Sequence, residues 1–157
     1  MKRVTTWAAR LASWLPGIFL GIFAWIYGRD AMYQMTSNDY WFKVDQMLVM
    51  DAEEGTQPRM SVIRQINKPF LAEWVATVRR LDPDGLTLAC VGDGKSHYIP
   101  EGRLPLNMNL EWWVGKKCDL QPGRYQVDTK WILEIPGYGD RRVVEVRSNI
   151  FTIQPKT

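Results

Sequence analysis

The sequence predicts a protein in two parts, an N-terminal membrane-spanning helix followed by one antiparallel β-sandwich of about seven strands. Two observations carry this prediction. Residues 11–28 form an uncharged, apolar stretch, and short runs of alternating apolar and polar residues fill most of the chain beyond it. A length of 157 residues leaves room for one domain and one appendage.

The apolar stretch at 11–28 has the length of a membrane-spanning helix. As a helix it is about 27 Å long, close to the roughly 30 Å hydrocarbon core of a bilayer. Trp14 lies toward one end and Trp25 and Tyr27 toward the other, where membrane interfaces favour aromatic residues. Two alternatives are weaker. A cleaved signal peptide would need a small-x-small pair after the stretch, and none follows it. A buried helix of a soluble domain would show a polar face, and this stretch has none.

Charge placement predicts the orientation of this helix. Lys2, Arg3 and Arg10 are the only charged residues among the first 28, and the remainder carries 17 basic and 17 acidic residues. The positive-inside rule places the N-terminus in the cytoplasm and the domain outside it. A neutral domain also argues against nucleic acid as a partner. The predicted parts are a basic cytoplasmic tail at 1–10, the anchor at 11–28, a juxtamembrane linker at 29–39 and the domain at 40–157.

A GxxxG pattern within the anchor suggests a second role for the helix. Gly17 and Gly21 are four residues apart, so they share one helix face and would let two helices approach closely in the lipid bilayer. Glycine is also frequent in such helices for other reasons, so a homodimer through this face rests on a weak motif.

The alternating runs predict strands that each bury one face. The clearest is 124–134, where Tyr125, Val127 and Trp131 share one parity and charged residues occupy the other. Comparable runs lie at 42–50, 70–79, 86–90, 104–112 and 144–153, and the last switches parity near Ser148, as a bulge requires. Turn residues at 82–85, 92–94 and 136–140 separate the runs, a spacing typical of a β-sandwich.

The segment Leu120–Val127, with the sequence LQPGRYQV, resembles the tyrosine corner of immunoglobulin-like and fibronectin-type sandwiches. The resemblance implies that the hydroxyl of Tyr125 bonds back to the preceding backbone. Val127 stands where antibody domains carry a cysteine, so their inter-sheet disulfide is not expected.

The whole chain also resembles small single-pass membrane proteins of bacteriophages and prophages. This likeness implies no known activity. It rests on Glu73-Trp74, Cys90, Trp112-Trp113, Cys118, the LQPGRY corner, Thr129, Trp131 and the run Ser148–Phe151.

Cys90 and Cys118 are the two cysteines of the chain. In a domain outside the cytoplasm, two cysteines favour one structural disulfide, worth roughly 3 kcal/mol for a loop of this size. Two free thiols or a metal pair are the alternatives. The metal pair is the poorer one because His97 is the only other soft ligand, and no metal or cofactor is expected.

No catalytic constellation stands out in the sequence. Ser96 and His97 are adjacent in a strand, so they point to opposite faces and form no nucleophile–base pair. The run Gly92–Ser96 lacks the glycine spacing and following helix of a phosphate loop. A hydrolytic enzyme, such as a carbohydrate-active one using scattered carboxylates, therefore stays an unfavoured alternative.

Two neighbouring tryptophans suggest a contact surface. If the strand at 104–112 continues, Trp112 shares the core-facing parity of Leu110, and Trp113 points outward. Trp113 is then the candidate for contact with a partner, because aromatic side chains anchor interfaces; coverage by a loop is the alternative.

Together these features predict a non-enzymatic protein-interaction module, anchored in the inner membrane with its C-terminal domain periplasmic or extracellular. A phage-encoded membrane or virion-associated accessory is the specific form favoured. A non-catalytic subunit of a larger membrane complex is the first alternative.

Overall fold

The N-terminal unit, Met1–Ser37, contains one long helix, α1 (Thr5–Met35). The structure, a computed structural model, describes residues 5–116 and 118–156, and for 5–13 it describes the backbone alone. The side chains of the predicted basic tail at 1–10 therefore lie outside the described residues. The helix continues through 29–35, most of the stretch predicted as a linker.

The predicted anchor at 11–28 lies within α1. In the part of the chain that the structure describes, no helix combines the length and the apolarity needed to cross a membrane. From Trp14 onward the helix mixes its aliphatic residues with glycine, tryptophan and tyrosine, and it then meets Arg29 and Asp30.

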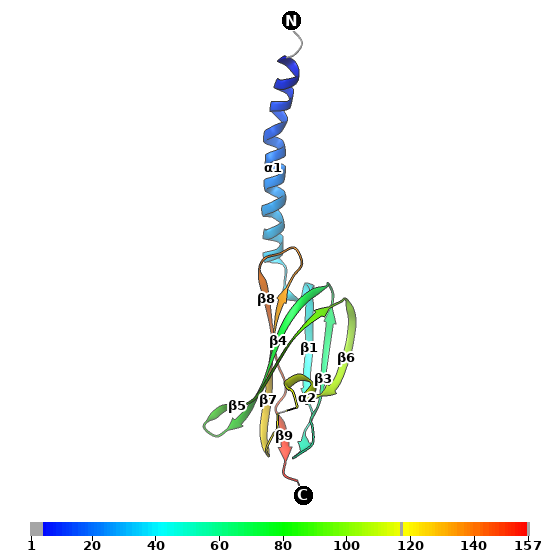
Figure 1. The fold of residues 1–157 in the computed structure, drawn as a ribbon, viewed down its shortest axis with the longest axis vertical. Helices are drawn as coiled ribbons and strands as arrows, with labels where there is room; N and C mark the ends of the chain where they lie inside the picture. The colour runs from blue at the N-terminus through cyan, green and yellow to red at the C-terminus, as the bar shows by residue number, and fades with distance from the viewer. Residues whose placement is uncertain (1–4, 117, 157) are drawn as a thin grey trace. The chain divides into compact units, whose positions relative to one another are not determined.

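The second unit, Asn38–Thr157, is built almost entirely of strands. Figure 1 shows their course along the chain. The elements are η1 (Asn38–Tyr40), β1 (Phe42–Val49), β2 (Ala52–Glu53), β3 (Arg59–Ile66), β4 (Phe70–Asp82), β5 (Gly85–Tyr98), β6 (Glu101–Asn109), α2 (Leu110–Val114), β7 (Gly123–Glu134), β8 (Arg141–Arg147) and β9 (Phe151–Gln154).

The strands form two sheets, as the sequence predicts. The smaller sheet has the order β1-β3-β6, with antiparallel neighbours. The larger sheet has the order β2-β9-β7-β4-β5, and β8 also pairs with β7. In this sheet only the two-residue β2 pairs in parallel. The alternating patterns in the sequence thus correspond to a β-sandwich.

The core lies between the inner faces of the two sheets. From Phe70 to Val78 of β4 and from Tyr125 to Leu133 of β7 every second residue is buried, because side chains alternate between the faces of a strand. Phe42 from the smaller sheet packs against Phe70 and Trp131 from the larger, with ring centroids 5.4 and 5.3 Å apart. Burial of such large rings is the main source of stability in a domain of this size.

The break between β8 and β9 is the predicted bulge. Asp128 of β7 pairs with Arg147, whereas Tyr125 of β7 pairs with Phe151. Two residues of β7 therefore face the three residues 148–150, which is the one-residue excess that defines a bulge. The register confirms the parity switch near Ser148, although the run forms two strands rather than one.

Two details of β5 differ from the prediction. Gly92-Asp93-Gly94, predicted as a turn, lies inside the strand. A Cβ at Gly92 would collide with the backbone of α2, and one at Gly94 would collide with the indole of Trp74, so both glycines serve close packing. Leu86 and Leu88, predicted to face the core, are exposed.

Candidate interaction surface

The outer face of the larger sheet is formed by the alternate residues that do not enter the core. The strand register brings them into rows across β5, β4, β7 and β8. One row holds Val91, Thr77, Asp128 and Arg147, and the next holds Asp93, Val75, Lys130 and Glu145. Within the second unit, α2 packs against the other face of this sheet, where Trp113 stacks on Trp74.

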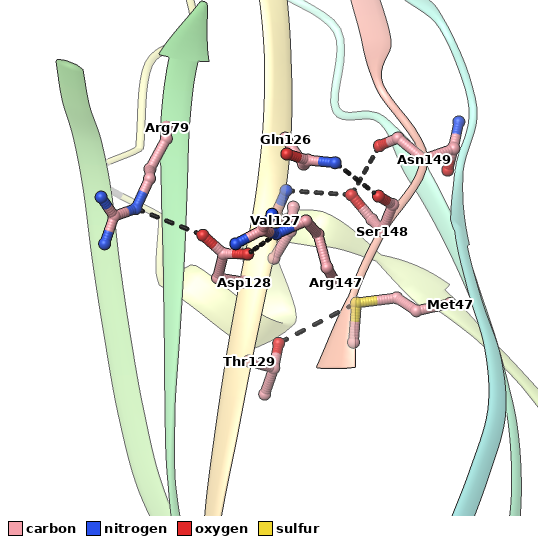
Figure 2. Close-up of polar contacts among 9 residues, drawn as sticks. All are labelled: Met47, Arg79, Gln126, Val127, Asp128, Thr129, Arg147, Ser148 and Asn149. Atoms are coloured by element: carbon pink, nitrogen blue, oxygen red, sulfur yellow. Dashed lines mark hydrogen bonds and ion pairs between the residues drawn. The ribbon is translucent and has the colours of Figure 1, made fainter. Parts of the chain in front are cut away.

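Asp128 lies at the centre of a charged cluster on this face. Its carboxylate accepts from Nε of Arg147 at 2.6 Å and lies 3.2 Å from Nε of Arg79, as Figure 2 shows. The hydrogen bond from the guanidinium to Asp128 raises the pKa of Arg147. Two cations thus share one carboxylate, which leaves a positive excess at this position.

The opposite end of the face is balanced. Lys95 donates to Glu73 at 3.0 Å, and Arg141 lies 2.7 Å from a carboxylate oxygen of Glu134. The hydrogen bond lowers the pKa of Glu73 and raises that of Lys95. Exposed pairs of this kind contribute little to stability.

An aliphatic patch borders the Asp128 cluster. It consists of Val75, Leu86, Leu88 and Val91, which are 36, 52, 66 and 49% exposed. Leu88 pairs with Arg79 across the strands, so the patch and the cluster share one face. A shallow depression of about 590 Å³ lies next to it, lined by Val75, Thr77, Arg79, Asp128, Thr129, Lys130, Glu145, Val146 and Arg147.

The bulge beneath this face is held by side-chain hydrogen bonds. The backbone N–H of Val127 donates to Oγ of Ser148 at 2.9 Å, and the amide of Gln126 donates to the carbonyl of Ser148 at 2.9 Å (Figure 2). The Asn149 side chain accepts from the N–H of Val49 at 2.7 Å and donates to its carbonyl at 2.9 Å. Asn149 thereby joins β1 of the smaller sheet to the edge of the larger one.

Cys90 and Cys118 lie at disulfide-bonding distance, with Cα atoms 5.6 Å apart. The pair ties β5 to the segment between α2 and β7. Tyr125, at the start of β7, donates its hydroxyl to the carbonyl of Gln121 at 2.6 Å, the contact that defines a tyrosine corner. Burial raises the pKa of this tyrosine.

The prediction for Trp113 is wrong. Its side chain is only 2% exposed, its indole N–H donates to Oγ1 of Thr129 at 3.2 Å, and its ring stacks on Trp74. Trp112, predicted to enter the core, is 64% exposed. The reason is that 110–114 forms the helix α2, in which neighbours lie about 100° apart rather than on opposite faces.

Gly17 and Gly21 lie within α1, and a Cβ at either position would meet no atom within 4 Å. The space at these positions is compatible with close approach by another helix. The homodimer through this face stays a prediction.

The residues that the structure describes include no group of three or more His, Cys, Asp or Glu arranged to hold a metal. The pKa values of Asp45 and Glu73 are lowered, in each case chiefly by a hydrogen bond from a lysine. No protein-family model matches the chain, and no curated protein matches it.

Proposed function

We propose that the β-sandwich is a protein-interaction module that binds its partner through the outer face of the larger sheet. The aliphatic patch beside the Asp128 cluster carries this proposal. Burial of exposed apolar groups against a partner is favourable in free energy, and arginine is enriched at protein interfaces. Side chains on strands are held more rigidly than side chains on loops, which suits a binding surface.

The charges of the face indicate the chemistry of the partner. Arg79 and Arg147 share the single carboxylate of Asp128, so the complement is an apolar surface bordered by at least one acidic side chain. A second copy of this chain fits less well, because a two-fold contact places the same positive excess on both sides.

The strand order supports the finer assignment of an immunoglobulin-like, fibronectin-type sandwich. Numbered by order in the chain and leaving out the short β2, the order β1-β3-β6 corresponds to strands A, B and E of that fold, and β4-β7-β8/β9 corresponds to C, F and G. Tyr125 stands at the start of the F-equivalent strand, and Trp74 is a buried tryptophan on the C-equivalent one.

We further propose that the module works outside the cytoplasm, next to the inner membrane. Disulfides persist in oxidising compartments, and the Cys90–Cys118 pair is at bonding distance. Helix α1 exposes many large apolar side chains, among them Trp14, Phe19, Phe23 and Trp25, which favour contact with a lipid bilayer. A phage-encoded accessory, or a subunit of a larger membrane complex, is compatible with this location.

Photo-crosslinking in the cells that express the full chain tests the binding face. A photoreactive residue at Leu88 is expected to give one discrete adduct with another protein, and Arg147→Glu is expected to remove it. The matched control places the same residue at Asn107, exposed on the smaller sheet. An adduct of twice the chain's mass, or equal adducts from both positions, would refute the proposed face and partner.

Thiol labelling of intact cells tests the location. A membrane-impermeant maleimide is expected to label the chain only after reduction. Labelling that requires permeabilised cells but no reductant would place the domain in the cytoplasm.

Liposome flotation tests the bilayer contact of α1. The full chain is expected to float with vesicles of phosphatidylethanolamine and phosphatidylglycerol, and Phe19→Ser with Phe23→Ser is expected to reduce the floating fraction. The control is Tyr40→Ser, an exposed aromatic outside α1. Equal flotation of all three chains would count against the role of the helix.

A further inference from the structure

A second depression lies away from the outer face of the larger sheet, near α2 and the turn between β5 and β6. We name it the aromatic groove. Its volume is about 490 Å³, and it is lined by Arg64, Ile66, Trp74, Ser96, His97, Tyr98, Ile99, Pro100, Glu101, Leu106, Trp112 and Trp113. Strands of both sheets and α2 contribute to it, so its lining residues are far apart in the sequence.

Of the four aromatic rings that line the groove, only Trp112 is largely uncovered. Trp74 and Trp113 stack on each other with ring centroids 4.9 Å apart. Tyr98 stacks on Phe70 at 4.9 Å, and the guanidinium of Arg64 lies 5.5 Å from its ring centroid. The indole of Trp112 is therefore the one open aromatic platform in the groove.

The position of this platform is fixed by its neighbour. Trp113 is buried, hydrogen-bonded to Thr129 and packed on Trp74, and it belongs to the same short helix as Trp112. The Cys90–Cys118 pair restrains the chain a few residues further on. An exposed ring on a preorganised element loses little conformational freedom when a ligand covers it.

The polar groups of the groove are both donors and acceptors, and their charges cancel. Nη2 of Arg64 lies 3.5 Å from a carboxylate oxygen of Glu101, an ion pair with a long separation that leaves hydrogen-bonding capacity on both groups. Ser96 and His97 also line the groove. This arrangement suits an uncharged ligand rich in hydroxyl groups.

We infer that the aromatic groove is a saccharide-binding site. One pyranose ring would lay its C–H face on the indole of Trp112, because an aromatic face is electron-rich and attracts weakly polarised C–H groups. Hydroxyls of the sugar would accept hydrogen bonds from the guanidinium of Arg64 and donate hydrogen bonds to the carboxylate of Glu101. This site is separate from the proposed protein-binding face and does not depend on it.

Two other ligand classes fit the groove less well. A quaternary ammonium needs several free ring faces and an unpaired carboxylate, whereas Glu101 has Arg64 beside it and only one ring is open. A proline-rich peptide binds between parallel aromatic ridges and makes few side-chain hydrogen bonds, whereas here polar groups surround a single platform.

Titration of the full chain with neutral tetrasaccharides tests the inference. The probes are cellotetraose, chitotetraose, maltotetraose and mannotetraose, in a detergent without a sugar head group, and the readouts are indole fluorescence and calorimetry. At least one probe is expected to bind, and Trp112→Ala is expected to weaken it by about tenfold or more, the loss of one stacking contact. Glu101→Gln, an exposed and nearly isosteric change, is expected to weaken the same probe.

The control variant is Tyr40→Ala, which removes an exposed aromatic ring outside the groove and is expected to leave saccharide binding unchanged. Decaproline and tetramethylammonium are titrated in parallel. The inference is overturned if none of the four saccharides binds, if decaproline or tetramethylammonium binds in their place, or if saccharide binding is the same in Trp112→Ala.

Discussion

The two faces of the larger sheet are made from the same strands and differ in almost every physical property. Trp74 and Trp131 pair across β4 and β7 and are buried on the inner face. Their next neighbours, Val75 and Lys130, also pair, and they are exposed on the outer face. A shift of one residue therefore separates a position that holds the fold together from one that is free to bind. The inner face limits what substitutions the domain tolerates, whereas the outer face is the one that we propose binds a partner.

The largest effect expected from this contrast is the loss of an inner-face ring. Trp131→Ala removes a fully buried indole that contacts Phe42 and Trp113, so the free energy of unfolding is expected to fall by about 3–5 kcal/mol. Urea denaturation measures it, with Trp131→Phe as the milder variant. Lys130→Ala, one residue away on the outer face, is expected to change stability by no more than about 0.5 kcal/mol. Equal losses of stability in Trp131→Ala and Lys130→Ala would contradict the difference between the two faces.

Removal of the Cys90–Cys118 link is expected to have the next largest effect. The two residues are 28 apart in sequence, and a closed loop of that length stabilises by about 3–4 kcal/mol through the entropy of the unfolded chain. Cys90→Ala with Cys118→Ala is compared with the oxidised parent by thermal unfolding. If reductant lowers the melting temperature of the parent and leaves that of the double variant unchanged, the disulfide is formed in solution. If reductant has no effect on the melting temperature of the parent, the disulfide is not formed.

Ser148→Ala is expected to cost about 1–3 kcal/mol, because it leaves the buried N–H of Val127 without its side-chain acceptor. The bulge lies where the outer face ends and the sheets are joined, so hydrogen exchange at Val127 and Val49 should report the local opening. Ser96→Ala, at an exposed serine of β5, serves as the control. Unchanged exchange at Val127 would argue that a water replaces the hydroxyl at no cost.

Tyr125→Phe sharpens the comparison at the inner face, since it keeps the buried ring and removes only the hydroxyl bonded to Gln121. A loss of about 0.5–1.5 kcal/mol is expected for one neutral hydrogen bond. Denaturant unfolding detects it, and Tyr40→Phe is the exposed counterpart. A stability equal to that of the parent would mean that this hydrogen bond orients the chain at the corner without stabilising the fold.

The smallest effects belong to the outer face. The pKa of Glu73 is lowered by Lys95, so this pair stabilises the fold above the ordinary carboxyl pKa of 4.5, and the contribution is lost as the pH falls through the lowered value. Glu73→Gln is expected to flatten the stability profile slightly on the acid side, and high salt is expected to do the same. A large acid-side change in this variant would show that the outer face contributes more to folding than its exposure suggests.

Local pattern alone was sufficient for much of the sandwich. Alternation around Trp74 and Trp131 predicted which residues enter the core, since side chains in a strand have a period of two. The parity switch predicted the bulge at Ser148, and the LQPGRY run predicted the hydrogen bond of Tyr125. The boundary near residue 39 lies close to the division between Ser37 and Asn38.

Other features depend on tertiary contacts between segments that are far apart in the sequence. Strand β3, with half-buried residues on both parities, carries too weak an alternation to be recognised. The apolar parity of the run at 104–112 extends to Trp112, which predicts a strand up to that residue. The chain instead forms a helix at 110–114, because Leu110, Trp113 and Val114 are then buried where the helix contacts β4 and β5. The Gly-Asp-Gly sequence at 92–94 is typical of a turn. The two glycines are instead required by close packing, Gly92 against α2 and Gly94 against Trp74.

The sequence by itself determined most of the strands, the apolar face of most of them and several of the turns, because these depend on neighbours within a few residues. The tertiary structure alone decided which strands pair, that Trp112 rather than Trp113 is exposed, and that Val75, Leu86, Leu88 and Val91 gather beside Arg79 and Arg147. Those outcomes depend on contacts between residues far apart in the chain, and their free energy appears only when the two sheets pack together.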